Sequence, residues 1–198
     1  MKIIKDINIE KLAFTLPEKD EDGYYISKCE YDGDNEGMYW LLRNVNIEES
    51  FTDEDDMIVK EGKNKSIFEQ FVLLDKKIVE EIEENSEEWF GKRLKKEVVQ
   101  RNYKTLLKEN FIDEALLTIP LERTEEDQEL TFDIYNHKKE LVDETELEYP
   151  LKIHTLLNLR GLRFTRSKVE PLWDVIQIKV LEEVVEKVEK KCLIDDEN

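Results

Sequence analysis

The sequence predicts a mainly β (α+β) fold, a partly open Greek-key β-barrel with a helical insertion at about residues 67–108. Two observations predict it. Short segments with an apolar period of two lie before and after the insertion, and turns rich in Gly, Asp or Asn separate them. Apolar residues recur at helical spacing inside the insertion. About eight short strands with one helical insertion are typical of a small barrel or sandwich.

Three strands are expected before the insertion, at residues 7–16, 24–31 and 38–45. Their aromatic and β-branched side chains favour strands, and short turns rich in Asp and Gly connect them. This arrangement predicts a three-stranded meander. Residues 46–66 have the composition of a loop.

Helices are expected in the insertion. Apolar side chains recur at helical spacing from Phe68 to Ile82, and Asp75 is interpreted as the N-cap of a helix over residues 76–84. Gly91 is expected to end a further helical turn, and the apolar stripe continues over residues 93–101.

The period of two returns after the insertion and predicts strands at residues 115–121, 130–135, 151–159, 162–164 and 173–181. A hairpin turn is expected at residues 136–139. The apolar phase changes from odd to even positions at Gly161, which predicts a β-bulge or a sharp bend there. We expect residues 1–181 to form a single domain and residues 182–198 to form an acidic C-terminal helix or tail.

Two basic islands interrupt a chain whose formal net charge is −19. The first basic island, residues 91–108, has seven Lys or Arg against one Glu, and the second, residues 151–181, has six against two acids. Aromatic residues lie in or beside both. Because cations bind phosphates and flat rings stack on unpaired bases, this combination is typical of single-stranded nucleic-acid binding. The candidate binding residues are Arg160, Arg163, Phe164, Arg166, Lys168, Lys92, Arg93, Lys95, Lys96, Arg101, Tyr103 and Lys104.

Both islands also have a purely structural interpretation, in which acidic neighbours neutralise them. The acidic segment 80–88 could neutralise the first island, and the arginines of the second could balance the acidic surface. Two other functions stay open. One is a virion structural, minor capsid or scaffold protein whose charged faces make protein–protein contacts. The other is an acidic mimic of nucleic acid, since residues 18–56 carry 14 acids against three bases.

The sequence gives no positive sign of an enzyme, a cofactor or a metal site. It contains no G-x-G-x-x-G, no phosphate-binding loop and no G-x-S-x-G. Residues 32–37 begin like a calcium loop, but Arg43 stands where a bidentate Glu is required. Cys29 and Cys192 are expected to be free thiols. No segment approaches the roughly 20 apolar residues of a membrane helix. We therefore expect a non-enzymatic intracellular protein with no membrane contact.

Several features together resemble the single-stranded-DNA-binding proteins of phages and large DNA viruses. These features are Phe71, Asp75, Trp89 and Phe90 in the centre, the hairpin at 132–143, Leu159, Gly161, Leu162 and Phe164 in one strand, Trp173, Gln177, Ile178, Lys179 and Val180 in the last strand, and the acidic tail. The resemblance covers roughly residues 67–181.

The resemblance implies a barrel of the oligonucleotide-binding (OB) type. It implies sequence-tolerant binding of single-stranded DNA in viral replication or recombination, with a protein partner recruited by the acidic tail. The implied location is the host cytoplasm or nucleus, or the virion, and self-association stays open. The resemblance would place Arg160, Arg163, Phe164 and Trp173 in the binding groove.

Overall fold

The computed structural model describes residues 2–47, 56–109, 115–126 and 128–181. Its elements are β1 (Ile3–Ile4), η1 (Ile9–Lys11), β2 (Leu12–Phe14), β3 (Glu18–Lys19), β4 (Tyr25–Tyr31), β5 (Met38–Ile47), β6 (Asp56–Lys60), η2 (Gly62–Asn64), α1 (Lys65–Phe90), α2 (Lys96–Asn102), β7 (Leu107–Glu109), β8 (Ala115–Pro120), β9 (Asp133–Tyr135), η3 (Glu144–Glu146), β10 (Leu151–Phe164) and β11 (Val169–Val180). The predicted acidic tail lies outside the described residues.

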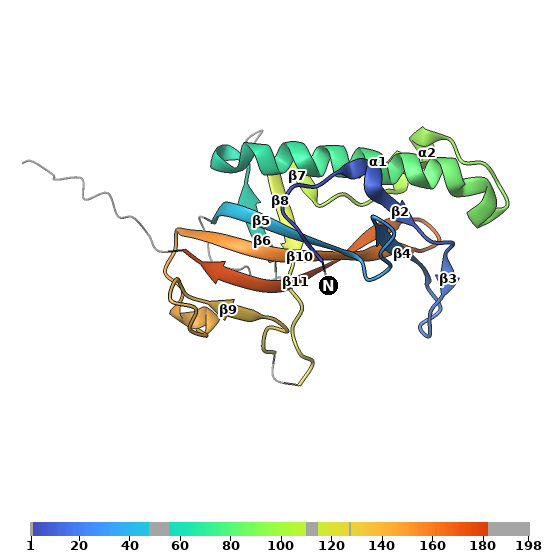
Figure 1. Cartoon of the computed structure of the whole chain (residues 1–198). Helices are drawn as coiled ribbons and strands as arrows, with labels where there is room; N and C mark the ends of the chain where they lie inside the picture. The colour runs from blue at the N-terminus through green and yellow to red at the C-terminus, as the bar shows by residue number, and fades with distance from the viewer. Residues whose placement is uncertain (1, 48–55, 110–114, 127, 182–198) are drawn as a thin grey trace, which may run out of the picture.

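Strand β10 is the centre of the larger sheet. One of its edges pairs antiparallel with β5 and then with β4, and its other edge pairs with β11. The parallel partners β1 and β9 extend the sheet beyond β5 and β11, and β2 and β3 both pair with β4. A smaller sheet has the strand order β6–β8–β7. The larger sheet curls into a half-barrel beneath the long helix α1 (Figure 1). This confirms the mainly β class and the partly open barrel.

Gly161 lies where β10 changes partner from β5 to β4. The pairing of β10 with β11 shifts register between Leu159 and Gly161, which confirms the irregularity predicted from the apolar phase. A Cβ atom at position 161 would lie 2.1 Å from the backbone carbonyl oxygen of Ser27 on β4. Glycine is therefore what allows β4 to approach β10 this closely.

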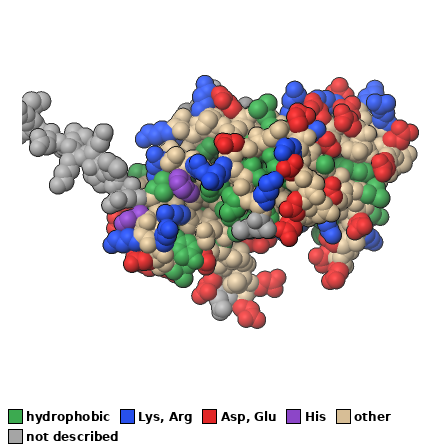
Figure 2. Space-filling model, in the orientation of Figure 1, with side chains coloured by type: hydrophobic (Ala, Val, Ile, Leu, Met, Phe, Trp, Pro, Cys, Tyr) green, Lys and Arg blue, Asp and Glu red, His purple; other side chains and the backbone are tan. Residues whose placement is uncertain are grey.

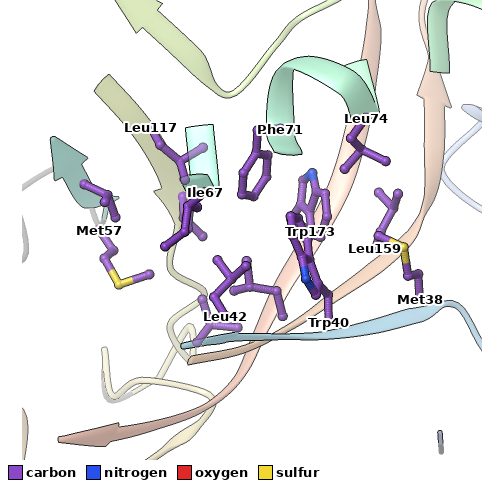
Figure 3. Close-up of a cluster of buried hydrophobic side chains, with 14 of the residues drawn as sticks. Met38, Trp40, Leu42, Met57, Ile67, Phe71, Leu74, Leu117, Leu159 and Trp173 are labelled. Carbon is purple, nitrogen blue, oxygen red and sulfur yellow. The ribbon is translucent and has the colours of Figure 1, made fainter. Parts of the chain in front are cut away.

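The core lies between α1 and the curled sheet. The ring of Phe71 on α1 has its centroid 5.0 Å from Trp40 on β5 and 5.7 Å from Trp173 on β11. Aromatic pairs at these separations are attracted beyond the effect of area burial alone. Figure 3 shows this cluster together with Met38, Leu42, Met57, Ile67, Leu74, Leu117 and Leu159. These contacts fix α1 across the sheet.

The predicted meander is wrong in its third strand. Strand β2 pairs with β4 as expected, but β5 pairs with β10 and β1 instead of with β4. The physical reason is the length of β10, which accommodates β5 and β4 one after the other along one edge. Only residues 12–14 of the first predicted strand are extended, after the 3-10 turn η1.

The predicted break in the helix is also wrong. Helix α1 runs without interruption from Lys65 to Phe90, so Asp75 lies in its interior and is not an N-cap. The Asp75 carboxylate accepts hydrogen bonds from the Tyr103 hydroxyl (2.7 Å) and the Thr105 hydroxyl. Gly91 does end the helix, at φ 63°, as the sequence predicts.

The predicted hairpin turn forms, with the Asn136 N–H donating to the Glu140 carbonyl oxygen at 2.9 Å. Cys29 is buried with a free thiol, and burial raises its pKa to about 12. In the part of the chain that the structure describes, no helix is long and apolar enough to cross a membrane.

Candidate nucleic-acid interface

The turn between β10 and β11, residues 165–168, brings the two basic islands together. The backbone N–H of Lys104 donates to the Val169 carbonyl oxygen at 2.8 Å, directly after this turn. A hollow of about 250 Å³ beside the turn is lined from the first island by Leu94, Val98, Val99 and Asn102, and from the second by Phe164, Arg166 and Lys168. The islands therefore meet at the end of the molecule that carries α2 (Figure 1).

An aromatic groove of about 830 Å³ shares this turn with the hollow. The side chains that define it here are Tyr24, Tyr25, Trp89, Phe90, Phe164 and Arg166. Tyr24, Tyr25 and Phe90 are 43%, 52% and 39% exposed. Exposed rings around a groove, with a cation at its edge, have the chemistry that binds unpaired bases and the neighbouring phosphate.

Phe164 anchors the wall of the aromatic groove. Its ring centroid lies 5.9 Å from that of Trp89 and 5.3 Å from that of Phe90, in edge-to-face geometry. Phe164 is only 8% exposed. The expectation that Phe164 itself stacks on a base therefore needs correction, because its ring is used to hold Trp89 and Phe90 in place.

Tyr103, the other predicted stacking residue, is also turned inward. Its hydroxyl donates to Asp75 on α1. Burial, together with the neighbouring Asp75 carboxylate, raises the pKa of Tyr103 well above its usual value. Tyr103 thus links the first basic island to the helix and does not present its ring to a ligand.

Glu170 binds two of the predicted phosphate-binding cations. Its Oε2 accepts from Nη2 of Arg163 at 2.6 Å and from Nε of Arg163 at 3.2 Å. Its Oε1 lies 3.4 Å from Nζ of Lys104. The Arg163 hydrogen bonds lower the pKa of the Glu170 carboxyl, so this side chain stays ionised as a fixed anchor.

Two further predicted cations have acidic partners inside the chain. Nε of Arg160 lies 2.8 Å from Oδ2 of Asp174, and Nζ of Lys96 lies 2.9 Å from Oε1 of Glu80. The latter pair joins the first island to the acidic face of α1, as the structural interpretation expects.

The remaining predicted cations are exposed. They are Lys92, Arg93, Lys95, Arg101, Arg166 and Lys168. None of them makes an ion pair with another residue in the described ranges. The loop that carries the first three is fixed because Ser86 Oγ accepts the Leu94 N–H at 2.9 Å and donates to the Glu83 carbonyl oxygen at 2.7 Å.

Comparisons with known proteins identify the family. The sequence model of one family matches residues 44–194, which is most of the chain. The chain belongs to DUF5871, a family of unknown function. No curated protein matches it.

Three of the solved structures similar to this DUF5871 protein are of one bacteriophage protein. The single-stranded DNA-binding protein from bacteriophage Enc34 is 12% identical at a TM-score of 0.38, over 87% of this chain and 90% of that chain. The structure of the same protein in complex with ssDNA is 12% identical at a TM-score of 0.36, over 88% of this chain and 97% of that chain. The structure of its C-terminal truncation is 13% identical at a TM-score of 0.35, over 89% of this chain and 98% of that chain.

Sequence reasoning does not find Tyr24 and Tyr25 as site residues of the DUF5871 protein. They lie outside both basic islands, where Tyr25 is the first residue of β4 and Tyr24 directly precedes it. Consecutive residues of a strand point to opposite faces, so two successive tyrosines place at least one ring away from the core. This tyrosine pair is a signal that a search for cations overlooks.

Charges of both signs lie close together on the surface of the molecule. Figure 2 shows Lys and Arg side chains interspersed with Asp and Glu over the visible face. In the described ranges, no group of three or more His, Cys, Asp or Glu side chains is placed to hold a metal ion. Binding of a polyanion to the DUF5871 protein would therefore depend on local cations at the groove, because the overall field is repulsive.

The buried carboxyl of Asp75 should give stability a recognisable pH dependence. Burial raises its pKa above the ordinary value of 3.8, so the folded state holds this proton more tightly than the unfolded state does. Stability from this group is therefore lost as the pH rises through the window between the two pKa values. We expect the unfolding free energy of the wild type, minus that of Asp75→Asn, to fall across this window in urea titrations.

Asp143→Asn supplies a control of opposite sign. Hydrogen bonds from the hydroxyl and backbone N–H of Thr145 lower the pKa of Asp143, so its contribution is lost as the pH falls. The difference between the wild type and Asp143→Asn should rise with pH. A pH-independent difference for Asp75→Asn would show that Asp75 is not desolvated as described.

Proposed function

We propose that this protein is a non-enzymatic single-stranded-DNA-binding protein with little sequence preference. The observation that carries the proposal is the aromatic groove, where Tyr24, Tyr25 and Phe90 are exposed beside Arg166. Stacking on such rings contributes about 1–3 kcal/mol per base and tolerates any base, because every base has a flat face. A role in viral replication or recombination belongs to the same proposal.

Single strands suit this groove better than duplexes. Bases in a duplex are stacked on each other and cannot reach side chains that line a concave surface, whereas unpaired bases can turn outward. The exposed cations on both sides of the β10–β11 turn would follow the phosphates. They include Arg166 and Lys168 in the turn and Arg101 at the end of α2.

Phosphate contacts predict a steep dependence on salt. Each phosphate neutralised on a single strand contributes about −0.7 to the slope of log affinity against log salt. The slope would reach about −4 if all of the exposed predicted cations engaged.

The test is fluorescence anisotropy with a labelled oligo-dT and a duplex of equal length, at low and near-physiological salt. We expect tight, salt-sensitive binding of the single strand and weaker binding of the duplex. The variant Arg166→Gln/Lys168→Gln should weaken oligo-dT binding and make the slope shallower by about 1.4. Absence of binding at low salt, or a preference for the duplex, would overturn the proposal.

Lys138→Gln/Lys152→Gln is the matched control. It also removes two positive charges from exposed positions, but one lies in the turn after β9 and the other at the start of β10. The turn after β9 and the start of β10 lie at the opposite end of the molecule from α2 (Figure 1). This control should bind as the wild type does.

The structural or scaffolding alternative would need a broad exposed apolar patch. Among the described residues, the exposed large apolar side chains outside the groove lie on different elements: Ile3 on β1, Leu16 after β2, Val72 and Leu73 on α1, and Leu141 after β9. A nucleic-acid mimic would use the acidic residues 18–56, of which 48–55 lie outside the described residues. We therefore favour DNA binding, with residues 1–181 as one domain and the acidic tail as the proposed contact for a protein partner.

A further inference from the structure

We infer that Arg163 positions Tyr24 for base stacking and is not a phosphate contact. The inference rests on the proposed function and assigns separate roles to the basic residues of the groove. The sequence suggests the opposite role for Arg163, because an exposed arginine in a basic island is ordinarily expected to bind phosphate.

Arg163 is held between two strands. It lies directly opposite Glu170 in the pairing of β10 with β11, and opposite Ile26 in the pairing of β10 with β4. Two of its N–H groups are directed at Oε2 of Glu170. The Glu170 side chain is only 15% exposed, so a phosphate that displaced it would leave a largely buried carboxylate without its arginine.

The guanidinium group also covers one face of Tyr24. Its central carbon lies 5.4 Å from the centroid of the Tyr24 ring. A cation over a ring at this distance is attracted by the negative face of the π-system. Since Tyr24 is still 43% exposed and lines the groove, a base can approach the ring surface that Arg163 leaves open.

These contacts form a chain from a fixed anchor to the ligand. Glu170 on β11 orients Arg163, Arg163 orients Tyr24, and Tyr24 faces the groove. Arg166 has no ion-pair partner among the described residues and is free to bind phosphate. Two arginines three positions apart thus act on different parts of a nucleotide.

Salt dependence separates the two roles. Wild type, Arg163→Gln, Arg163→Lys and Arg166→Gln are titrated with oligo-dT and with an abasic oligomer of equal length, each over a series of salt concentrations. Arg163→Gln should weaken oligo-dT binding about fivefold, leave binding of the abasic oligomer unchanged and keep the wild-type salt slope. Arg166→Gln should weaken both ligands equally and make the slope shallower by about 0.7.

Arg163→Lys tests whether the planar geometry of the guanidinium group matters, because the positive charge is kept. Lysine keeps the charge but lacks the planar fork that bonds Glu170 and stacks on the ring, so it should behave like Arg163→Gln. Thermal unfolding of each variant checks that the fold is retained.

Each outcome decides a different question. A shallower slope and equal loss of both ligands in Arg163→Gln would make Arg163 a phosphate contact and overturn the inference, as would wild-type binding in that variant. Either result would leave the proposed function standing. Wild-type protein that binds neither oligomer at low salt would overturn the proposed function itself.

Discussion

Gly161→Ala should lower the free energy of unfolding by about 3 kcal/mol. The added Cβ would lie 2.1 Å from the Ser27 carbonyl oxygen, 3.0 Å from the Ser27 carbonyl carbon and 3.1 Å from the Lys28 Cα. All of these are backbone atoms, so no rotation of a side chain can relieve the clash. Strand β4 would have to move away from β10 and lose its pairing. Urea unfolding followed by circular dichroism measures the loss.

Gly62→Ala is the matched control. An added Cβ at position 62 meets no atom within 4 Å, and its φ is not in the left-handed region. This substitution should change the unfolding free energy by no more than about 0.5 kcal/mol. If Gly161→Ala were as stable as Gly62→Ala, the close approach of β4 to β10 would be refuted.

Tyr24→Ala/Tyr25→Ala should weaken oligo-dT binding by about 30-fold or more. Each ring that stacks on a base contributes about 1–3 kcal/mol, and both rings line the aromatic groove. Anisotropy titrations at one fixed salt concentration measure the effect. Because no charge changes, the salt slope should stay near that of the wild type.

Two variants control for the loss of surface rings. Val72→Ala/Leu73→Ala trims two side chains of similar exposure, 55% and 53%, on α1 outside the groove. Its affinity should equal that of the wild type. Tyr24→Phe/Tyr25→Phe keeps both rings and should also bind normally. Full affinity in the double alanine variant would show that these rings do not contact the strand.

Local sequence signals predicted local structure well in this chain. The phase change at Gly161 and the αL end of α1 at Gly91 each depend on a few neighbouring residues. The partner of β5 depends instead on β10, more than a hundred positions later, and no turn signal encodes that choice. Asp75 has the residue type of an N-cap, but its hydrogen-bond donors come from residues 103 and 105.

At the candidate site, too, local features could be predicted from the sequence and long-range contacts could not. Charge counting found both basic islands, and they do meet at one end of the molecule. It could not show which cations are neutralised, because the partner of Arg163 is set by the register of β10 against β11. The sequence pointed to Phe164 as a stacking residue and did not point to Tyr24, since the exposure of a ring depends on the packing of distant elements.

The position of β10 late in the sequence determines when the larger sheet can form during translation. Strands β4 and β5 emerge early, but the strand that joins them ends at residue 164. At a synthesis rate of roughly 5–20 residues per second, β10 is completed on the order of ten seconds after these apolar strands. The sheet can therefore close only late in synthesis, and until then the apolar faces of β4 and β5 lack their central partner.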